Sequence, residues 1–174
     1  MRTRALLPLA LLAVAAPVGA QTEAAIRDEM LGHFEQSSAK FVMLAEAMPG
    51  SLYEWAPAEG VMEVGHVYMH VARYNFMYLE DNLGIPAPQD VDLDALEGIR
   101  DKARVQALLQ RSIEHVRSAV GALPAADVGR TTELYGRDVP GWAVLVQLVA
   151  HMNEHLGQSI AYARMNGVVP PWSG

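Results

Sequence analysis

The chain has 174 residues, a length that suits a single domain, and 51% of its residues are hydrophobic while 19% are charged. This composition excludes a disordered polyelectrolyte and a collagen-like chain, and the absence of cysteine excludes disulfides, thiolate metal sites and a cysteine nucleophile. The formal net charge of -7 argues against nucleic acid as a partner, because phosphate binding needs clustered basic side chains.

The N-terminal segment has the three-part pattern of a secretory signal peptide. Two arginines begin it, residues 5–16 form an apolar run, and small residues precede Gln21. The run is shorter than the roughly 20 apolar residues that span a bilayer. The order of charge, run and small residues favours a signal over the alternative, which is the start of a core helix. We expect residues 1–20 to be removed, leaving residues 21–174 in the periplasm or secreted, with no membrane partner.

Four stretches of the mature chain have the apolar spacing of amphipathic helices. In the first, Ile26, Met30 and Phe34 recur at helical intervals with charged residues on the other faces. Glycine and proline punctuate the ends of these stretches. We expect helices at about 22–48, 60–83, 100–123 and 140–167.

The remaining mature segments are predicted to be loops. Residues 84–93 are rich in proline and aspartate, and residues 124–140 are rich in glycine, aspartate, threonine and proline. No alternating strand pattern exceeds four residues, so no strands are expected. Four helices of this length predict an all-α four-helix bundle, and the two longer connections could accommodate a crossover.

Histidine spacing is the main chemical signal. His151 and His155 are four residues apart, so their side chains lie one turn apart on the same helical face. Apolar neighbours bracket this pair, which places it towards the bundle interior. His66 and His70 repeat the spacing on the second helix. A divalent metal would satisfy buried imidazoles at a bundle core, where such sites are built from facing helices.

Alternatives to a metal site remain for these histidines. The pairs could lie on the surface, or they could be core histidines bonded to carbonyls. A metalloprotease is excluded because its motif needs glutamate directly after the first histidine. Here Glu154 precedes His155, which turns it about 100° away from the metal face. His33 and His115 have charged neighbours and are expected to be solvated.

Three segments resemble the DinB/YfiT-like superfamily of metal-binding four-helix bundles, and the likeness covers nearly all of the mature chain. The segment GVMEVGHVYMHVARYN is similar to the family segment that carries the first ligand. HMNEHLGQ is similar to the segment with the paired ligands, and ARMNGVVPPWS is similar to the family's C-terminal ending. The resemblance implies antiparallel pairing of helices one and two and of helices three and four, with a crossover between helices two and three.

The resemblance also implies a site. His70, His151 and His155 match the family's three metal ligands, and zinc is the first candidate ion, with nickel or manganese as alternatives. Many family members form dimers, so a homodimer is expected. The family position matched by His66 is often acidic or amide, and here a fourth nitrogen ligand would partly close the site. Some branches act on low-molecular-weight thiols, but those thiols are cytosolic, which does not fit an exported protein.

An open three-histidine site would suit a metal-dependent hydrolase or transferase that acts on a small substrate. Glu63, His66 and Tyr74 fall on related turns and are the candidate proton carriers, although core packing also explains Tyr74. Two other classes stay open. One is a non-catalytic periplasmic protein that binds a metal or ligand, and the other is a structural helical dimer in which the histidines only stabilise the fold.

Export gives the first testable prediction. In its native host the mature protein should begin at Gln21 or within a few residues of it, because the small residues before that position suit a signal peptidase. Intact-mass measurement of the purified protein checks this. A mass that includes Met1 would contradict the prediction.

Overall fold

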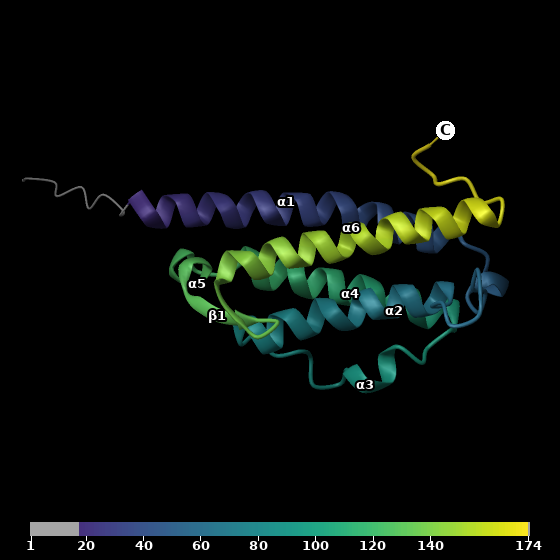
Figure 1. Cartoon of the computed structure of the whole chain (residues 1–174), viewed down its shortest axis with the longest axis horizontal. Coiled ribbons are helices and arrows are strands. Elements are labelled where there is room, and N and C mark those ends of the chain that lie inside the picture. The colour runs from purple at the N-terminus through teal and green to yellow at the C-terminus, as the bar shows by residue number, and fades with distance from the viewer. Residues whose placement is uncertain (1–17, 174) are drawn as a thin grey trace, which may run out of the picture.

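The computed structural model describes residues 18–173. Its four long helices are α1 (Val18–Ala47), α2 (Val64–Met77), α4 (Lys102–Gly121) and α6 (Gly141–Met165) (Figure 1). They confirm the all-α bundle and lie close to the four expected stretches. Residues 1–17 of the expected signal segment lie outside the described residues, so its removal stays a prediction. No described helix is long and apolar enough to cross a membrane.

The helices run in two parallel pairs. The colour gradient of Figure 1 shows α1 and α6 running in one direction and α2 and α4 in the other. Because α2 and α4 are parallel, the chain between them must return along the bundle, and it does so through the short helix α3 (Leu93–Leu96). The expected crossover and both antiparallel pairs are therefore confirmed. Both α4 and α6 pack against each of α1 and α2, which places α1 and α2 at opposite corners.

The second helix begins later than expected and ends differently. A 3-10 turn, η1 (Gly50–Leu52), and further turns precede α2, whose N-cap is Glu63. At its C-terminal end the regular helix continues into a π-helical segment, η2 (Tyr78–Asn82). Such widened turns are rare and are often found at functional sites. Their hydrogen-bond pattern is not visible in apolar spacing, which explains why one helix was expected over 60–83.

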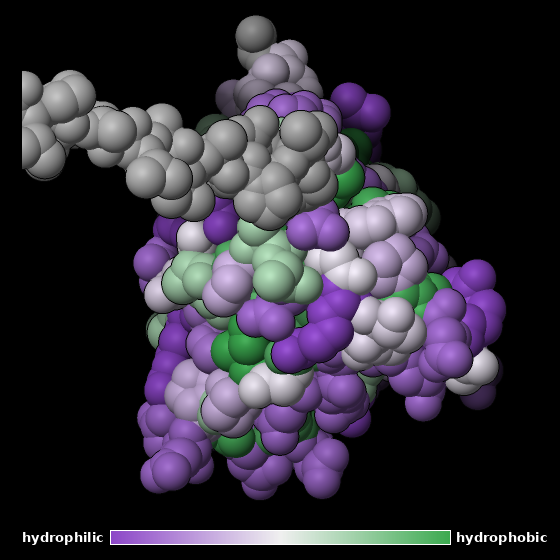
Figure 2. Space-filling view, turned by 90° about the vertical axis from the view of Figure 1, so that its left-hand side faces the viewer, coloured by the Kyte–Doolittle hydropathy of each residue, from purple (hydrophilic) through white to green (hydrophobic). Residues whose placement is uncertain are grey.

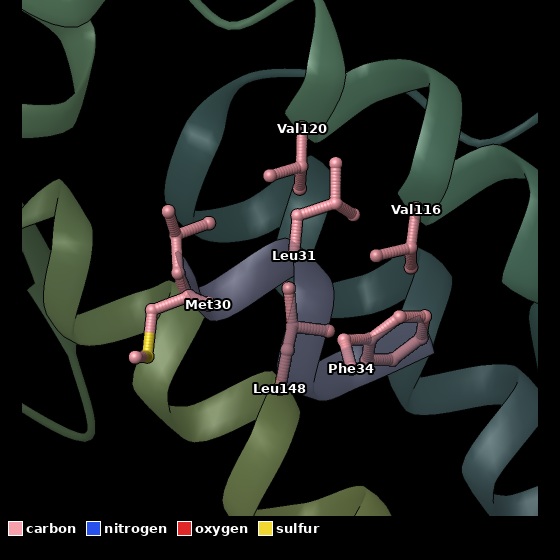
Figure 3. Close-up of a pocket in the computed structure, with 7 residues that line it drawn as sticks. Met30, Leu31, Phe34, Val116, Val120 and Leu148 are labelled. Carbon is pink, nitrogen blue, oxygen red and sulfur yellow. The ribbon is translucent and has the colours of Figure 1, made fainter. Parts of the chain in front are cut away.

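Apolar side chains from all four long helices fill the core. Phe41 of α1 is fully buried and meets Tyr68 of α2 edge-on, with ring centroids 5.0 Å apart. Figure 3 shows a second region of the core, where side chains from α1, α4 and α6 surround a cavity of about 10 Å³. A space of that volume holds at most about one water molecule, so these side chains pack closely.

Two short strands correct the expectation of no strands. β1 (Thr131–Leu134) pairs antiparallel with β2 (Arg137–Pro140), after the short helix α5 (Ala125–Gly129). The turn between the strands holds Tyr135 at φ 53° and Gly136 at φ 72°, the left-handed pair that tight hairpins require. The strands escaped prediction because each has only four residues and only Leu134 of the hairpin is buried.

The end of the bundle near the hairpin and α5 has a largely hydrophilic surface. Figure 2 views the molecule from this end and shows small hydrophobic areas between hydrophilic residues. Scattered apolar residues are normal on a soluble surface.

Candidate metal centre

Three histidines from two helices converge inside the bundle. His70 lies in the middle of α2, and His151 and His155 lie one turn apart on α6. One potential ligand atom of each histidine lies within 4.8 Å of the corresponding atoms of the other two. His151 and His155 are only 7% and 8% exposed, and the His70 side chain is 15% exposed. The three side chains could therefore hold one metal ion.

The helical period explains why these side chains meet. On α2, Val67 and Val71 flank His70 and are fully buried. On α6, Leu148 and Met152 are buried beside the histidine pair. Each histidine thus belongs to the face that its helix turns inward, and burial of the apolar neighbours brings the imidazoles together.

Glu97 fixes the ring of His70. The Nδ1 atom of His70 lies 2.9 Å from Oε1 of Glu97, and because an ionised carboxylate only accepts hydrogen bonds, this nitrogen carries the proton. The lone pair is then on Nε2, where it is available to a metal. Orientation of a ligand histidine by a carboxylate is common at metal sites.

Gln158 fixes the ring of His155 in the same way. Its Oε1 accepts a hydrogen bond of 2.8 Å from Nδ1 of His155, while its Nε2 donates one of 2.8 Å to the Tyr162 hydroxyl. In this orientation of the amide its oxygen faces the histidine, whose Nδ1 then donates the hydrogen bond. His155 therefore also presents Nε2 as the free acceptor.

His151 is held differently. Among the described residues neither of its ring nitrogens has a hydrogen-bond partner. Its ring instead packs against Tyr74, with centroids 4.8 Å apart, and against Tyr78, with centroids 5.7 Å apart and planes at 86°. The rings of His70 and His155 complete its surroundings at 5.2 and 4.6 Å.

Burial favours the neutral forms of His151 and His70. Burial, together with repulsion by positive charge on His155 and His70, lowers the pKa of His151 to about 3. Burial also lowers the pKa of His70, although the hydrogen bond to Glu97 opposes this. Burial raises the pKa of the Glu97 carboxyl, but its hydrogen bonds with His70 and His66 outweigh that effect and hold the pKa below its ordinary value. Neutral imidazole is the form that binds metals.

The structure places the three candidate proton carriers at different distances from the histidines. Tyr74 is the nearest, since its ring centroid lies 4.4 Å from that of His70. His66 lies one turn before His70 on α2, and its Nε2 is 3.3 Å from Oε2 of Glu97. It is not part of the group of three histidines that could hold one ion. The Glu63 carboxylate forms an ion pair with Arg100. Their proposed roles in proton transfer stay predictions.

The two histidines expected to be solvated have different surroundings. His33 is exposed, and its Nε2 lies 3.2 Å from Oε1 of Glu29. His115 is half-buried, with its ring 5.3 Å from that of Phe76 and its Nε2 buried without a hydrogen-bond partner among the described residues. The expectation for His115 was wrong, because its ring packs on Phe76 although the neighbouring Glu114 and Arg117 are exposed.

Sequence reasoning missed Glu97 and Tyr78. Glu97 lies directly after α3 in the crossover, where no periodic pattern marks it. Tyr78 has the spacing of a core residue, and only the structure shows its ring beside His151. The stripe of His151 and His155 does extend to Gln158 at helical spacing, which is the one signal of the surrounding hydrogen-bond network.

The sequence of this chain is similar to a known protein family. A family model described as the DinB superfamily matches residues 33–159. The chain belongs to the DinB superfamily. This confirms the resemblance, and the match includes the two histidine-bearing segments, whereas the C-terminal segment lies beyond it. Metal binding is common in this superfamily. A search of curated proteins gives no significant match.

Solved structures support the fold. A DinB-like protein from Bacillus cereus superposes with a TM-score of 0.72 at 16% identity, covering 83% of this chain and 95% of its own. A DinB-like protein from Bacillus subtilis, YjoA, has a TM-score of 0.57 at 21% identity, with coverage of 80% and 92%. A conserved protein from Enterococcus faecalis has a TM-score of 0.51 at 16% identity, with coverage of 86% and 97%. At these identities the likeness establishes the fold alone.

The buried imidazole of His151 makes the stability of the metal-free protein depend on pH. Its pKa is about 3 in the folded chain and about 6.5 when unfolded, so the unfolded state gains protons first as the pH falls. The contribution of neutral His151 to the free energy of unfolding is therefore fully present above about pH 6.5. It is lost as the pH falls below that value, by at most about 1.4 kcal/mol per pH unit.

Urea denaturation in the presence of a chelator, at about pH 7.5 and about pH 5, measures this loss. The variant His151→Gln should lose less free energy of unfolding across this range than the wild type. Equal losses in the two proteins would contradict the burial of a neutral His151.

Proposed function

We propose that this protein binds one divalent metal ion through His70, His151 and His155 and uses it as a hydrolase or transferase acting on a small substrate. The observation that carries the proposal is the convergence of three potential ligand atoms within 4.8 Å. Imidazole ligands suit zinc and nickel, whereas manganese prefers oxygen ligands. Zinc is therefore the first candidate.

The donor set of the chain fits such an ion. Two of the three rings have Nδ1 occupied by hydrogen bonds, with Glu97 and Gln158, so that Nε2 is their remaining acceptor. Three protein nitrogens are the number found in catalytic zinc sites, which keep a position open. His66 is engaged with Glu97 and lies outside the group of three, which favours an open site over a closed four-nitrogen shell.

An ion in this site would act as a Lewis acid and would lower the pKa of bound water. The protein's own residues would orient the histidines and carry protons. Glu97 holds His70 and His66 at once through its two carboxylate oxygens. His66 has a side chain that is 28% exposed, so in this proposal it can exchange protons with solvent. The half-buried Tyr74 is the second proposed proton carrier, since it contacts His70 and His151. The third, Glu63, is less favoured because it is paired with Arg100.

One observation favours a second function. His151 and His155 are more than nine-tenths buried, which restricts the approach of a substrate from their side. A non-catalytic metal- or ligand-binding protein would need no such access. The two functions differ in whether an added small molecule can reach the ion.

We also propose the location, the oligomeric state and the class of partner of this protein. The charged start and apolar run of the sequence support export to the periplasm or beyond. A homodimer is proposed from the resemblance to the family. The net charge of -7 supports a small molecule rather than nucleic acid as the partner.

Elemental analysis of the purified protein tests the metal proposal. The wild type should contain about one divalent ion per chain, and alanine at any one of His70, His151 or His155 should lower metal affinity by at least about 100-fold, because each removal deletes a ligand outright. The exposed His33 offers a matched control, and His33→Ala should keep wild-type affinity. Stoichiometric metal in the double variant His151→Ala, His155→Ala would show that the assignment is wrong.

A further inference from the structure

Tyr135 occupies an unfavourable backbone position at the tip of the hairpin. Its φ of 53° lies in the left-handed region, and among the described residues it is the only non-glycine residue with a positive φ. Asparagine, aspartate and glycine are preferred at this position of a tight hairpin turn. A bulky aromatic residue there is an outlier, and such outliers cluster at functional sites.

The side chain of Tyr135 reaches from the hairpin to η2. Although the residue is 61% exposed, its hydroxyl is hydrogen-bonded to the hydroxyl of the buried Tyr78. Tyr78 also accepts a hydrogen bond of 3.2 Å from Nε2 of Gln147. Gln147 lies one turn before His151 on α6, so the three polar groups form a network directly beside the histidines.

The hairpin and η2 border a pocket beside this bond. A pocket of about 270 Å³ lies between the two elements, lined by Met77, Tyr78, Asp81, Asn82, Glu133, Leu134 and Tyr135. The hairpin is tied to η2 separately, since Asn82 donates to the carbonyl of Glu133 and Thr132 donates to the carbonyl of Asn82. The hydrogen bond between the two tyrosines is therefore a further link between the hairpin and η2, beside those made by Asn82 and Thr132.

Tyr78 in turn contacts the histidine that lacks a hydrogen bond. His70 and His155 are oriented by polar partners at Nδ1, whereas His151 forms a T-shaped contact with Tyr78, with 86° between the ring planes. Tyr78 also packs against Tyr74 at 5.4 Å between centroids. The orientation of His151 thus depends on where the Tyr78 ring is held.

We propose that Tyr135 is a positioning residue of the metal centre, which fixes the ring of His151 by anchoring Tyr78. This inference rests on the proposed metal site. It assigns to the hairpin tip the role that Glu97 and Gln158 have for the other two histidines. A purely structural role for Tyr135 would be to stabilise the hairpin, and the two roles predict different results.

The test uses Tyr135→Phe, Tyr78→Phe and Tyr135→Asn in the full chain. Zinc affinity is measured by competition with a chelator, and the absorption spectrum of the cobalt-substituted protein reports ligand geometry. All three variants should bind zinc roughly tenfold more weakly than the wild type, the lower end of the range for residues that orient a ligand. Their cobalt spectra should also shift.

Tyr135→Asn separates positioning from stability. Asparagine suits the left-handed turn, so the metal-free variant should unfold at the same or a higher urea concentration than the wild type, while its zinc affinity still falls. The control is Tyr53→Phe, which removes a buried hydroxyl that donates to the carbonyl of Ala45 at 2.7 Å. It should lower stability and leave zinc affinity and the cobalt spectrum unchanged.

Two outcomes would overturn the inference in distinguishable ways. Wild-type zinc affinity and cobalt spectra in Tyr135→Phe and Tyr135→Asn would refute the positioning role and leave the metal site standing. Failure of the wild type itself to bind zinc or cobalt would refute the proposed metal site and the positioning role together.

Discussion

The antiparallel contact between α2 and α6 is the arrangement on which the rest of the site depends. His70 faces the His151–His155 turn only because the apolar faces of these two helices are buried against the same core. The same burial lowers the pKa of His151 and of His70 and so disfavours their charged forms. Buried nitrogens without partners are costly, and a bound divalent ion would offset that cost.

The direction of the helices determines what surrounds the histidines. Since α2 and α4 are parallel, their connection must run back along the bundle (Figure 1), and it carries Glu97 to His66 and His70. Arg100 in the same connection is bonded to Glu63 at the start of α2 and to the carbonyl of Glu97. These bonds fix the crossover both at the start of α2 and beside the histidines. An up-down-up-down bundle would have no such segment beside the histidines.

The features that could be predicted from the sequence are those that depend on the helical period within one segment. The i, i+4 spacing identified the histidine pairs, and apolar recurrence located four helices to within a few residues, apart from the late start of α2 and its π-helical end. Contacts made by loops could not be found in this way. Glu97 reaches His70 across 27 positions and Tyr135 reaches Tyr78 across 57, and neither residue belongs to a periodic segment. His115 was misjudged because charged sequence neighbours do not show which face packs on Phe76.

Anomalous diffraction from crystals of the zinc-loaded protein, recorded on both sides of the zinc absorption edge, tests the central claim most directly. We expect one strong anomalous peak about 2.0–2.1 Å from a ring nitrogen of each of His70, His151 and His155, with His66 not bound to the ion and at least one position taken by a non-protein ligand. A peak bonded elsewhere on the chain, or none beside these three rings, would contradict the metal centre.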